Sequence, residues 1–440
     1  MYNSIKFLNI LSFIYPEMRL AKGYKRKLNQ HFSIHIAENY KKEEFQEILA
    51  LNVKVHGESV SDYFKHIFLN HPRKEDILFL YIKDSNSNKI VSSISLWPLE
   101  WRIGSINVLV CEMGFVGTLE KYRGKELIVE LNNLYERIMA EKGYIISVIR
   151  GIPYYYRKLG YEFAIPLDHR MFLSPSMIPQ DDLEFLKIRK ANLDDIDLIA
   201  NKYNQYYENF FISNLFDKNC YISKFFNDNY NAFKTSTYLI ETGGKTIAYF
   251  TFGKSYDNLA YDIKTSDINR EYGIKILQFT KEITSIENPD QINLAVREDT
   301  DLAELIGELG GTTNNTYGWQ VKIPNLKLYL EKIKYILENR IFNSNFQGLT
   351  QDLRLSNYKT TIILSFKNGK ISIVKMEKGY PKEGSCDLQI PGSLLFKLIL
   401  GDMSFEEINH IIKDAMIIHK SREIIDVLFP KENLYPDTYY

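Results

Sequence analysis

The sequence has few cysteines and no excess charge of either sign. Its three cysteines, Cys111, Cys220 and Cys386, lie far apart and are odd in number, and its eight histidines are scattered. Such a set forms neither a disulfide framework nor the paired thiols of a zinc site, so we expect a function without a metal. With 55 basic and 55 acidic residues the net charge is zero. Nucleic-acid binders usually carry a basic excess, so a nucleic-acid partner is not expected.

Long apolar runs are also missing. No stretch approaches the ~20 apolar residues that span a bilayer. The apolar run Ile5–Tyr15 is interrupted by Asn9, ends at Pro16, and is followed by no cleavage site of small residues. We therefore expect a cytoplasmic protein without a transmembrane segment, in which residues 1–30 form an N-terminal extension. The basic stretch Lys22–Lys27 is expected to be a solvated helix end.

What the sequence does contain is a series of apolar strands with amphipathic helices between them. A chain of 440 residues exceeds one ordinary core, so two to three domains are expected. The first strands are expected at Phe32–Ile36, Ile77–Lys83, Lys89–Trp97, Asn107–Val116 and Tyr144–Ile149, and the first helices at about Lys41–Val53 and Glu126–Lys142. This β-α-β-β-β-α-β order predicts an α/β domain with a mixed sheet over residues 31–175.

The most informative stretch of the chain is Val116–Tyr161. It opens with a strand end, a tight turn that bears Arg123 and Gly124, and then an amphipathic helix. Such a junction directs free backbone N–H groups and the helix dipole at a bound anion. It closes with a segment in which Tyr156 stands four residues before Gly160, just after another strand.

Together these two features resemble the GNAT acyltransferases. The resemblance implies that acetyl-CoA is held by its pyrophosphate at the start of the helix, and that Tyr156 protonates the departing thiolate. Tyr154 and Tyr155 flank Tyr156 and are alternatives for that role. Transfer to an amine also needs a base, because an amine with a pKa of about 10 is mostly charged at neutral pH.

The resemblance also implies which residues hold the cofactor. The family pattern Arg/Gln-x-x-Gly-x-Gly/Ala is matched at Arg123, whereas Glu126 and Ile128 stand where the two glycines are expected. A carboxylate at Glu126 would repel a pyrophosphate unless it turns to solvent, so loss of cofactor binding is the alternative. The backbone of Met113–Val116 is expected to pair with the pantetheine arm as an added strand does. The expected cofactor-binding residues are Met113, Gly114, Phe115, Val116, Arg123, Gly124, Lys125, Glu126, Leu127 and Ile128.

A second part of the chain follows residues 174–182, whose two prolines and small polar residues predict a linker. A strand then leads into a helix for which Asn192 is the expected N-cap, with Asp195 in the first turn. This start resembles a second GNAT domain over residues 183–322. No Gly-rich anion turn occurs over Tyr261–Lys281, which predicts a degenerate copy without a cofactor site.

The last part, residues 323–440, resembles a sterol-carrier-protein-like domain. Its expected elements are a helix at Leu326–Asn339, a hairpin that turns at Asn368-Gly369, a helix at Ile390–Leu400, and a helix opened by a capping box at Ser404. The three parts in this order resemble the enhanced-intracellular-survival (Eis-like) acetyltransferases.

The resemblance leaves two carboxylates as candidates for the base. Glu112, on the strand before the anion turn, matches a glutamate that is the general base of several GNAT enzymes. In the Eis-like group that role belongs to the C-terminal carboxylate, which here is that of Tyr440. Trp97 and Trp101 are expected to pack in the core, with a wall of the amine pocket as the alternative.

We therefore expect an α/β protein of two tandem GNAT-like mixed sheets and a sterol-carrier-like α/β domain. It would move an acetyl group from acetyl-CoA directly to a primary amine, such as an aminoglycoside, a polyamine, a small metabolite or a lysine side chain. The alternative is a non-catalytic acyl-CoA- or lipid-binding protein, or a scaffold, descended from such enzymes. Eis-like relatives assemble into oligomers, which makes a homo-oligomer an open alternative to a monomer.

Overall fold

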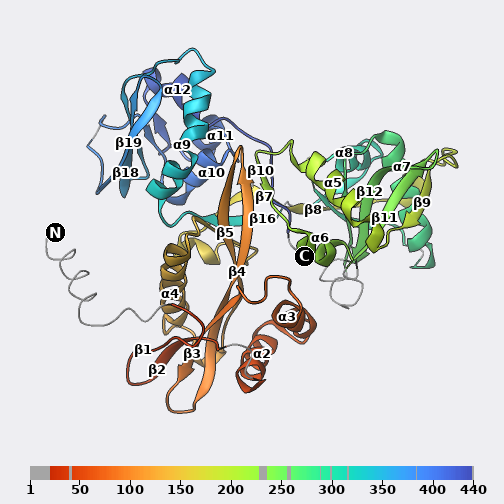
Figure 1. Cartoon of the computed structure of the whole chain (residues 1–440), viewed down its shortest axis with the longest axis horizontal. Helices are drawn as coiled ribbons and strands as arrows, with labels where there is room; N and C mark the ends of the chain where they lie inside the picture. Colours follow the sequence, from red (N-terminus) through yellow and green to blue (C-terminus); the bar gives the residue numbers. More distant parts are fainter. Residues whose placement is uncertain are drawn as a thin grey trace. The chain divides into compact units, whose positions relative to one another are not determined.

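The structure, a computed structural model, describes residues 20–38, 42–226, 235–254, 259–287, 289–297, 300–314, 317–382 and 384–438. The chain divides into two compact units, Met1–Pro98 with Cys111–Tyr144, and Leu99–Val110 with Ile145–Tyr440. Two long strands, β4 (Lys89–Ile103) and β5 (Ile106–Thr118), run from one unit into the other (Figure 1). The fold is mixed α/β, which confirms the class predicted from the sequence.

The first unit contains a sheet in the order β1-β2-β3-β4-β5, whose first four strands pair antiparallel. Its shorter strands are β1 (Lys25–Lys27), β2 (Phe32–Ile36) and β3 (Leu78–Asp84). Its helices are α2 (Lys42–His56), α3 (Val60–Leu69), the short 3-10 helix η1 (Glu120–Tyr122) and α4 (Leu127–Lys142). Helix α4 buries the side chains that recur at helical spacing and ends at Gly143, as its sequence pattern predicts.

One expectation for this unit is wrong. The stretch Lys22–Lys27 is not a helix end, because its last three residues form β1 and pair with β2 from Lys25 opposite His35 to Lys27 opposite Ser33. All three β1 residues are exposed and charged. The strand therefore buries no side chain and is held mainly by its backbone hydrogen bonds to β2. It lacks the alternation of apolar and polar residues by which a strand is predicted from sequence.

Aromatic side chains form the core of the first unit on the side of α3. The fully buried Phe64 ring lies 5.2 Å from that of Phe79 and 4.7 Å from that of Phe115, centroid to centroid. The buried Trp97 ring lies 5.4 Å from the Phe115 ring and 5.8 Å from the Tyr63 ring. Trp97 therefore packs in the core, as expected.

The second unit contains three groups of strands. The first continues β4 and β5 in the order β4-β5-β6-β16-β7, with β10 beside the end of β4 and β22 beside β10. The added strands are β6 (Ile146–Ile149), β7 (Glu162–Pro166), β10 (Ile212–Asn214), β16 (Gly318–Lys322) and β22 (Leu434–Tyr435). The 3-10 helix η2 (Tyr155–Leu159) connects β6 to β7. Trp101, near the end of β4, is fully buried in the core of this group, as expected.

The second group is a seven-stranded sheet in the order β15-β8-β14-β13-β12-β11-β9. Its strands are β8 (Asp168–Leu173), β9 (Lys187–Lys190), β11 (Thr235–Thr242), β12 (Lys245–Lys254), β13 (Tyr261–Thr265), β14 (Ile292–Arg297) and β15 (Thr312–Thr313). The elements packed with it are η3 (Pro175–Met177), η4 (Leu193–Asp195), α5 (Ile196–Tyr207), α6 (Lys218–Phe225), α7 (Arg270–Thr284), η6 (Ser285–Glu287) and α8 (Asp301–Glu308). Asn192 caps η4 in a capping box with Asp195, which confirms the predicted N-cap.

The two sheets exchange strands. Strand β8 lies within residues expected to form the first domain, yet it pairs with β14 of the seven-stranded sheet. Strand β16 comes from the following part of the chain, yet it lies between β6 and β7. The segments that make up each sheet are therefore not contiguous in the sequence.

The third group is a five-stranded sheet in the order β19-β18-β17-β20-β21. Its strands are β17 (Asp352–Ser356), β18 (Thr360–Lys367), β19 (Lys370–Lys378), β20 (Leu388–Gln389) and β21 (Met416–Ile417), and its helices are α9 (Leu326–Phe342), η7 (Gly392–Leu394), α10 (Leu395–Leu400), α11 (Phe405–Ile411), η8 (His419–Ser421) and α12 (Arg422–Leu428). The predicted hairpin turn is confirmed, because Asn368 and Gly369 both have positive φ angles, 50° and 76°. The predicted capping box at Ser404 is also present.

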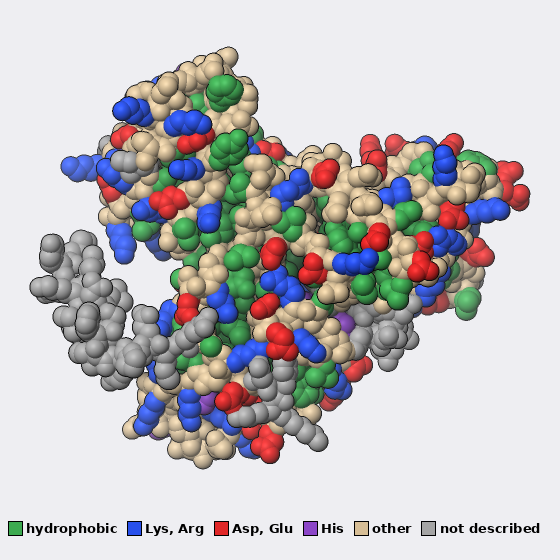
Figure 2. Space-filling model, viewed as in Figure 1, with side chains coloured by type: hydrophobic (Ala, Val, Ile, Leu, Met, Phe, Trp, Pro, Cys, Tyr) green, Lys and Arg blue, Asp and Glu red, His purple; other side chains and the backbone are tan. Residues whose placement is uncertain are grey.

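In the described part of the chain no helix is long and apolar enough to cross a membrane. On the face shown in Figure 2, basic and acidic side chains of the described residues are interspersed rather than gathered into separate regions. The balance of charge in the sequence thus reappears as a mixed surface on that face.

Candidate functional site

In the first unit, β5 leads into α4 through a turn with unusual backbone geometry. Gly124 has a φ of 76° and Glu126 a φ of 57°, so both residues are left-handed. Glycine adopts this conformation freely, whereas another residue is disfavoured there by about 1 kcal/mol. The turn therefore has, at Glu126, the backbone shape that suits the glycine expected from the sequence pattern.

The start of α4 has no side-chain cap. Glu126 is the N-cap residue, but its exposed side chain makes no capping hydrogen bond. Four helices of the second unit, α6 to α9, are capped by side chains that accept from the first turn, those of Asp217, Asn269, Thr300 and Asn325. In α4 the N–H groups of Leu127 and Ile128 have no acceptor within the helix. These donors, with the positive end of the helix dipole, are suited to an external anion.

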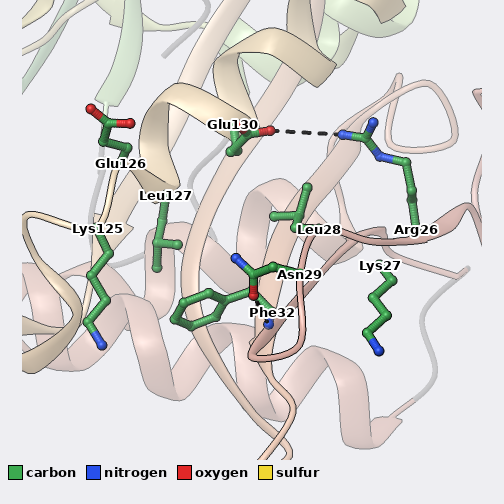
Figure 3. A pocket seen from close by; sticks show the side chains of 9 residues that line it. All are labelled: Arg26, Lys27, Leu28, Asn29, Phe32, Lys125, Glu126, Leu127 and Glu130. Carbon is green, nitrogen blue, oxygen red and sulfur yellow. Dashed lines mark hydrogen bonds and ion pairs between the residues drawn. The ribbon is translucent and has the colours of Figure 1, made fainter.

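The side chain of Glu126 does not cover these donors. In Figure 3 its carboxylate points away from Leu127 and from the ammonium group of Lys125. A carboxylate in this position is solvated, and its repulsion of an anion at the helix start is screened accordingly. The Glu126 side chain is thus turned toward solvent, the arrangement in which the sequence analysis expects the donors to stay accessible.

The turn is anchored to the sheet by Tyr122. The Tyr122 hydroxyl donates to the Asp84 carboxylate at 2.9 Å. Hydrogen bonds from Ser87, and to a smaller extent from Tyr122, lower the pKa of Asp84 to about 2. Asp84 therefore stays ionised and accepts these bonds throughout the neutral and mildly acidic range. Arg123 and Lys125, on the turn itself, are exposed, and the Lys125 ammonium lies 5.4 Å from the centre of the Tyr122 ring.

Strand β5 is irregular within Met113–Val116. Phe115 has a φ of 46°, which is rare for an aromatic residue and interrupts the pleat of the strand. Its carbonyl accepts from the Ser93 hydroxyl of β4 at 3.3 Å. At Gly114 a Cβ atom would lie 2.8 Å from the Trp97 indole, so only glycine fits there. Backbone strain of this kind gathers at binding and catalytic sites.

Glu112 precedes this irregular segment and is only 3% exposed. The Sγ of its neighbour Cys111 accepts from the Tyr135 hydroxyl of α4 at 3.2 Å, so Cys111 faces that helix. Successive side chains of a strand point to opposite faces, and Glu112 therefore lies on the face away from α4. The first unit thus brings together the predicted residues Glu112, Met113–Val116 and Arg123–Ile128 on one strand and the turn that follows it.

The predicted acid, Tyr156, lies on η2 in the second unit. It is 6% exposed, and its ring is edge-on to those of Tyr155 and Tyr161 at centroid distances of 5.0 Å and 6.1 Å. A Cβ atom added to Gly151 would lie 2.1 Å from the Tyr156 ring, so the ring fits against the backbone only because that residue is glycine. The Gly151 carbonyl is held in turn by the side chains of Gln320, at 2.7 Å, and Tyr317.

Burial distinguishes Tyr156 from the two tyrosines beside it. Tyr154 is 76% exposed, with a strained φ of 66°, and Tyr155 is half-buried beneath the Lys158 ammonium, which lies 3.6 Å from its ring centre. Burial, reinforced by Tyr155 and Tyr317, raises the pKa of Tyr156 above that of a free phenol. Tyr156 therefore keeps its proton at neutral pH, and it is a weaker acid than a solvated tyrosine.

The predicted base Tyr440 lies outside the described residues, which end at Thr438. The described end of the tail is docked in the second unit, and Asp437 is 4% exposed. The Asp437 carboxylate is paired with Lys224 at 2.7 Å and Lys264 at 2.5 Å. The Asn214 amide donates to the Asp437 carbonyl at 2.6 Å.

The seven-stranded sheet offers no counterpart to the open start of α4. Helix α7 follows β13, the position that α4 has after β5, but the side-chain oxygen Oδ1 of Asn269 accepts from the Tyr272 N–H at 2.9 Å. This helix start is therefore capped by its own chain. Among the described residues no group of three or more His, Cys, Asp or Glu side chains is arranged to hold a metal ion.

The sequence reasoning missed two features of this region. The positive φ of Phe115 and the placing of β1 beside the start of α4 depend on packing between distant segments. The nearest sequence signal for β1 is its basic composition, which predicts a solvated helix end rather than a strand.

Comparison with known proteins agrees with this geometry. Residues 37–164 match the family model described as the acetyltransferase (GNAT) domain. The chain therefore contains a GNAT acetyltransferase domain, and the match includes Glu112, the irregular part of β5, the turn, the start of α4 and Tyr156. This domain match supports acyl transfer in general. No curated protein sequence matches the chain significantly.

Solved structures share the fold along most of the chain. A GCN5-related N-acetyltransferase from Anabaena variabilis is 18% identical, with a TM-score of 0.66 over 92% of this chain and 99% of that one. A conserved protein from Enterococcus faecalis, described as a probable N-acyltransferase, is 14% identical with a TM-score of 0.69, over 93% of this chain and 100% of that one. Eis1 from Mycobacterium abscessus is 10% identical with a TM-score of 0.59, over 93% of this chain and 100% of that one. At these identities the likeness concerns the fold.

Proposed function

We infer that this protein transfers an acetyl group from acetyl-CoA directly to a primary amine. The observation that carries this inference is the start of α4, whose backbone donors are uncapped beside a turn that is left-handed at Glu126. A self-contained helix would use an N-cap side chain there, as α7 does with Asn269. An open helix start inside a GNAT-type domain is what a bound pyrophosphate requires.

The proposed cofactor site is made of two backbone segments. The N–H groups from Arg123 to Ile128 would hold the pyrophosphate, and Met113–Val116 would pair with the pantetheine arm. The irregularity at Phe115 supports the second assignment, because a bulged strand can turn peptide groups out of its own ladder.

The proposed chemistry uses Tyr156 as the acid and a carboxylate as the base. Tyr156 holds its proton at neutral pH. Its raised pKa lowers the driving force for proton transfer to the thiolate. The transfer would therefore depend on the hydroxyl lying close to the leaving sulfur. The amine proton would pass to Glu112 or to the carboxylate of Tyr440. The burial of Glu112 supports the first, and the docked tail before Tyr440 supports the second.

The acid role is tested by Tyr156→Phe, with Tyr154→Phe as the control on the same loop. Removing the Tyr156 hydroxyl should lower kcat about 100-fold, the usual range for a general acid, and change the acetyl-CoA dissociation constant less than about threefold. Tyr154→Phe should leave both quantities unchanged. Steady-state kinetics and calorimetry measure them, and an unchanged kcat in Tyr156→Phe would remove that residue from the mechanism.

A non-catalytic acyl-CoA-binding protein or scaffold is the competing proposal, and Glu126 is the observation that favours it. Both proposals require that the protein binds acetyl-CoA, and a thermal-shift titration tests this requirement. Acetyl-CoA at about 100 times its dissociation constant should stabilise the folded chain by roughly 2.7 kcal/mol. Stabilisation without turnover of any amine tested would favour the scaffold.

The other parts of the chain complete the proposal. We assign the Eis-like arrangement, with a degenerate second GNAT-like part over residues 183–322 and a sterol-carrier-like part over residues 323–440. The capped start of α7 supports the absence of a second cofactor site. Cys111, Cys220 and Cys386 form no disulfide in the described part of the chain, which suits the proposed cytoplasmic location.

A further inference from the structure

The ring of Tyr156 is not held in place by its own hydroxyl. Among the described residues that hydroxyl has no hydrogen-bond partner. The O–H group is therefore available to a ligand, and the position of the ring depends on what its carbon atoms pack against.

The surface on which the ring rests is the backbone of Gly151. A Cβ atom added there would lie 2.1 Å and 2.4 Å from two carbons of the Tyr156 ring. Gly151 is itself buried, but the loop continues through Ile152 and Tyr154, whose exposed fractions are 65% and 76%. An exposed loop has few packing contacts to fix its backbone. The position of the Tyr156 ring therefore depends on what holds Gly151.

Two side chains hold the Gly151 carbonyl. The side-chain NH₂ group of Gln320 donates to it at 2.7 Å and reaches the next carbonyl, that of Ile152, at 3.5 Å. The Tyr317 hydroxyl donates to the same Gly151 carbonyl. A carbonyl oxygen has two lone pairs, so these two donors satisfy it completely.

Both donors are fixed by the sheet and not by the loop. Gln320 is 1% exposed and lies on β16, opposite Ile149 of β6 and Phe163 of β7, the two strands that the loop connects. Tyr317 comes directly before β16, and its ring is edge-on to that of Phe163 at a centroid distance of 5.8 Å. A strand about 160 residues away in the sequence thus supplies the contacts that this loop lacks.

We propose that Gln320 and Tyr317 are positioning residues for Tyr156. They fix the Gly151 carbonyl, the Gly151 backbone fixes the ring, and the ring directs the hydroxyl to the leaving sulfur. This inference rests on the proposed function, in which Tyr156 is the acid. Proton transfer requires hydrogen-bond reach, so a displacement of about 1 Å can cost a large part of the rate. Removal of a donor leaves a buried carbonyl incompletely satisfied, which favours a shift of the loop toward water.

The first test is Gln320→Met, which keeps the length of the side chain and removes its donors. It should lower kcat about tenfold and change the acetyl-CoA dissociation constant less than about threefold. Gln278→Met is the matched control, because the Gln278 amide also donates to two backbone carbonyls, those of Pro179 and Asp181, both at 3.0 Å. That bond lies far from Tyr156 in the sequence and in a different sheet, so the control should leave both quantities unchanged.

A second variant guards against misfolding of β16. Tyr317→Phe removes a single hydroxyl and keeps the ring against Phe163, so it tests the inference even if Gln320→Met does not fold. It should lower kcat about three- to tenfold, again with little change in the acetyl-CoA dissociation constant. Steady-state kinetics and calorimetry on the full chain measure both quantities.

The decisive step repeats each variant in the Tyr156→Phe background. If Gln320 and Tyr317 act through the Tyr156 hydroxyl, each should then lower kcat by less than twofold, whereas a merely structural role would lower it by the same factor in both backgrounds. Equal factors in the two backgrounds, or an unchanged kcat in both single variants, would overturn this inference and leave the proposed function intact. An unchanged kcat in Tyr156→Phe itself would overturn the two together.

Discussion

At the scale of single residues, Glu126 combines two properties that oppose each other. Its backbone is left-handed, which favours glycine, and its side chain carries a charge of the same sign as the proposed ligand. The structure separates the two effects, because the exposed carboxylate turns away from Leu127 and Lys125 and the helix start stays open (Figure 3). The cost of Glu126 is therefore mainly local backbone strain and long-range repulsion.

Two substitutions at Glu126 measure these costs. Glu126→Gln removes only the charge, and Glu126→Gly also removes the strain. Each should tighten acetyl-CoA binding by about three- to tenfold, because repulsion between charges near a protein surface amounts to roughly 1 kcal/mol. The stability of Glu126→Gly should change little, since relief of the strain is offset by the greater entropy of glycine in the unfolded chain. Unchanged dissociation constants for both variants, measured by calorimetry, would show that the carboxylate is irrelevant to binding.

At the scale of secondary-structure elements, α4 and α7 occupy corresponding positions after a strand but begin differently. Helix α7 is closed by the Asn269 side chain, whereas α4 has an N-cap residue that makes no capping bond. A capped helix gains stability from its own chain, and an uncapped one leaves donors for something else. The cap at α7 is structural, and the uncapped start of α4 supports the proposed binding role of that helix.

Asn269→Ala tests this difference. Loss of the cap should lower the free energy of unfolding by about 1 kcal/mol, as is usual for an N-cap asparagine. The acetyl-CoA dissociation constant should stay the same, because α7 holds no cofactor in the proposed function. Urea denaturation and calorimetry give the two quantities. A weaker affinity in a fully folded variant would place a cofactor site at α7 and contradict the proposal.

At the scale of the whole molecule, the C-terminal tail joins elements that are far apart in the sequence. Within the second unit, the Trp319 indole N–H of β16 donates to the Pro436 carbonyl at 3.0 Å, and Lys224 of α6 and Lys264 of β13 pair with Asp437. Burial alone would raise the pKa of Asp437, but Lys224 and Lys264 outweigh it and hold that pKa at about 2.

Asp437→Asn should destabilise the protein in a pH-dependent way. Since the folded pKa is below the unfolded value of about 4, the ion pairs stabilise the fold above pH 4 and this contribution is lost as the pH falls toward 2. At neutral pH the variant removes the ion pair of buried Lys224 and leaves Lys264 only its longer pair with Asp168, at 3.7 Å, at a cost of about 3 kcal/mol. Urea denaturation should therefore show a large deficit at pH 7 that closes near pH 2.

The control for Asp437 is Asp197→Asn, because Asp197 pairs with Lys218 at 2.8 Å on the open surface. An exposed pair contributes little, so this variant should stay within about 0.5 kcal/mol of wild type at every pH. A deficit in Asp437→Asn that does not depend on pH would show that its charge has no part in holding the tail.

The local features of this protein follow from its sequence. The N-cap at Asn192, the capping box at Ser404, the turn at Asn368-Gly369 and the length of α4 depend on neighbours within a few residues, and all are confirmed. Such features can be predicted because a cap or a two-residue turn satisfies its hydrogen bonds inside one short segment.

The tertiary structure alone decided the rest. The exchange of β8 and β16 between sheets, the docking of Asp437, the direction of the Glu126 side chain and the placing of β1 beside the start of α4 all depend on segments far apart in the chain. Which distant segments pair depends on how much apolar surface they bury and on which strand edges still have unpaired backbone groups. Neither property is visible as a local pattern in the sequence. The sequence by itself determined that a tight turn with Arg123 and Gly124 leads into α4, and only the packing around that turn decided that the helix start has no side-chain cap.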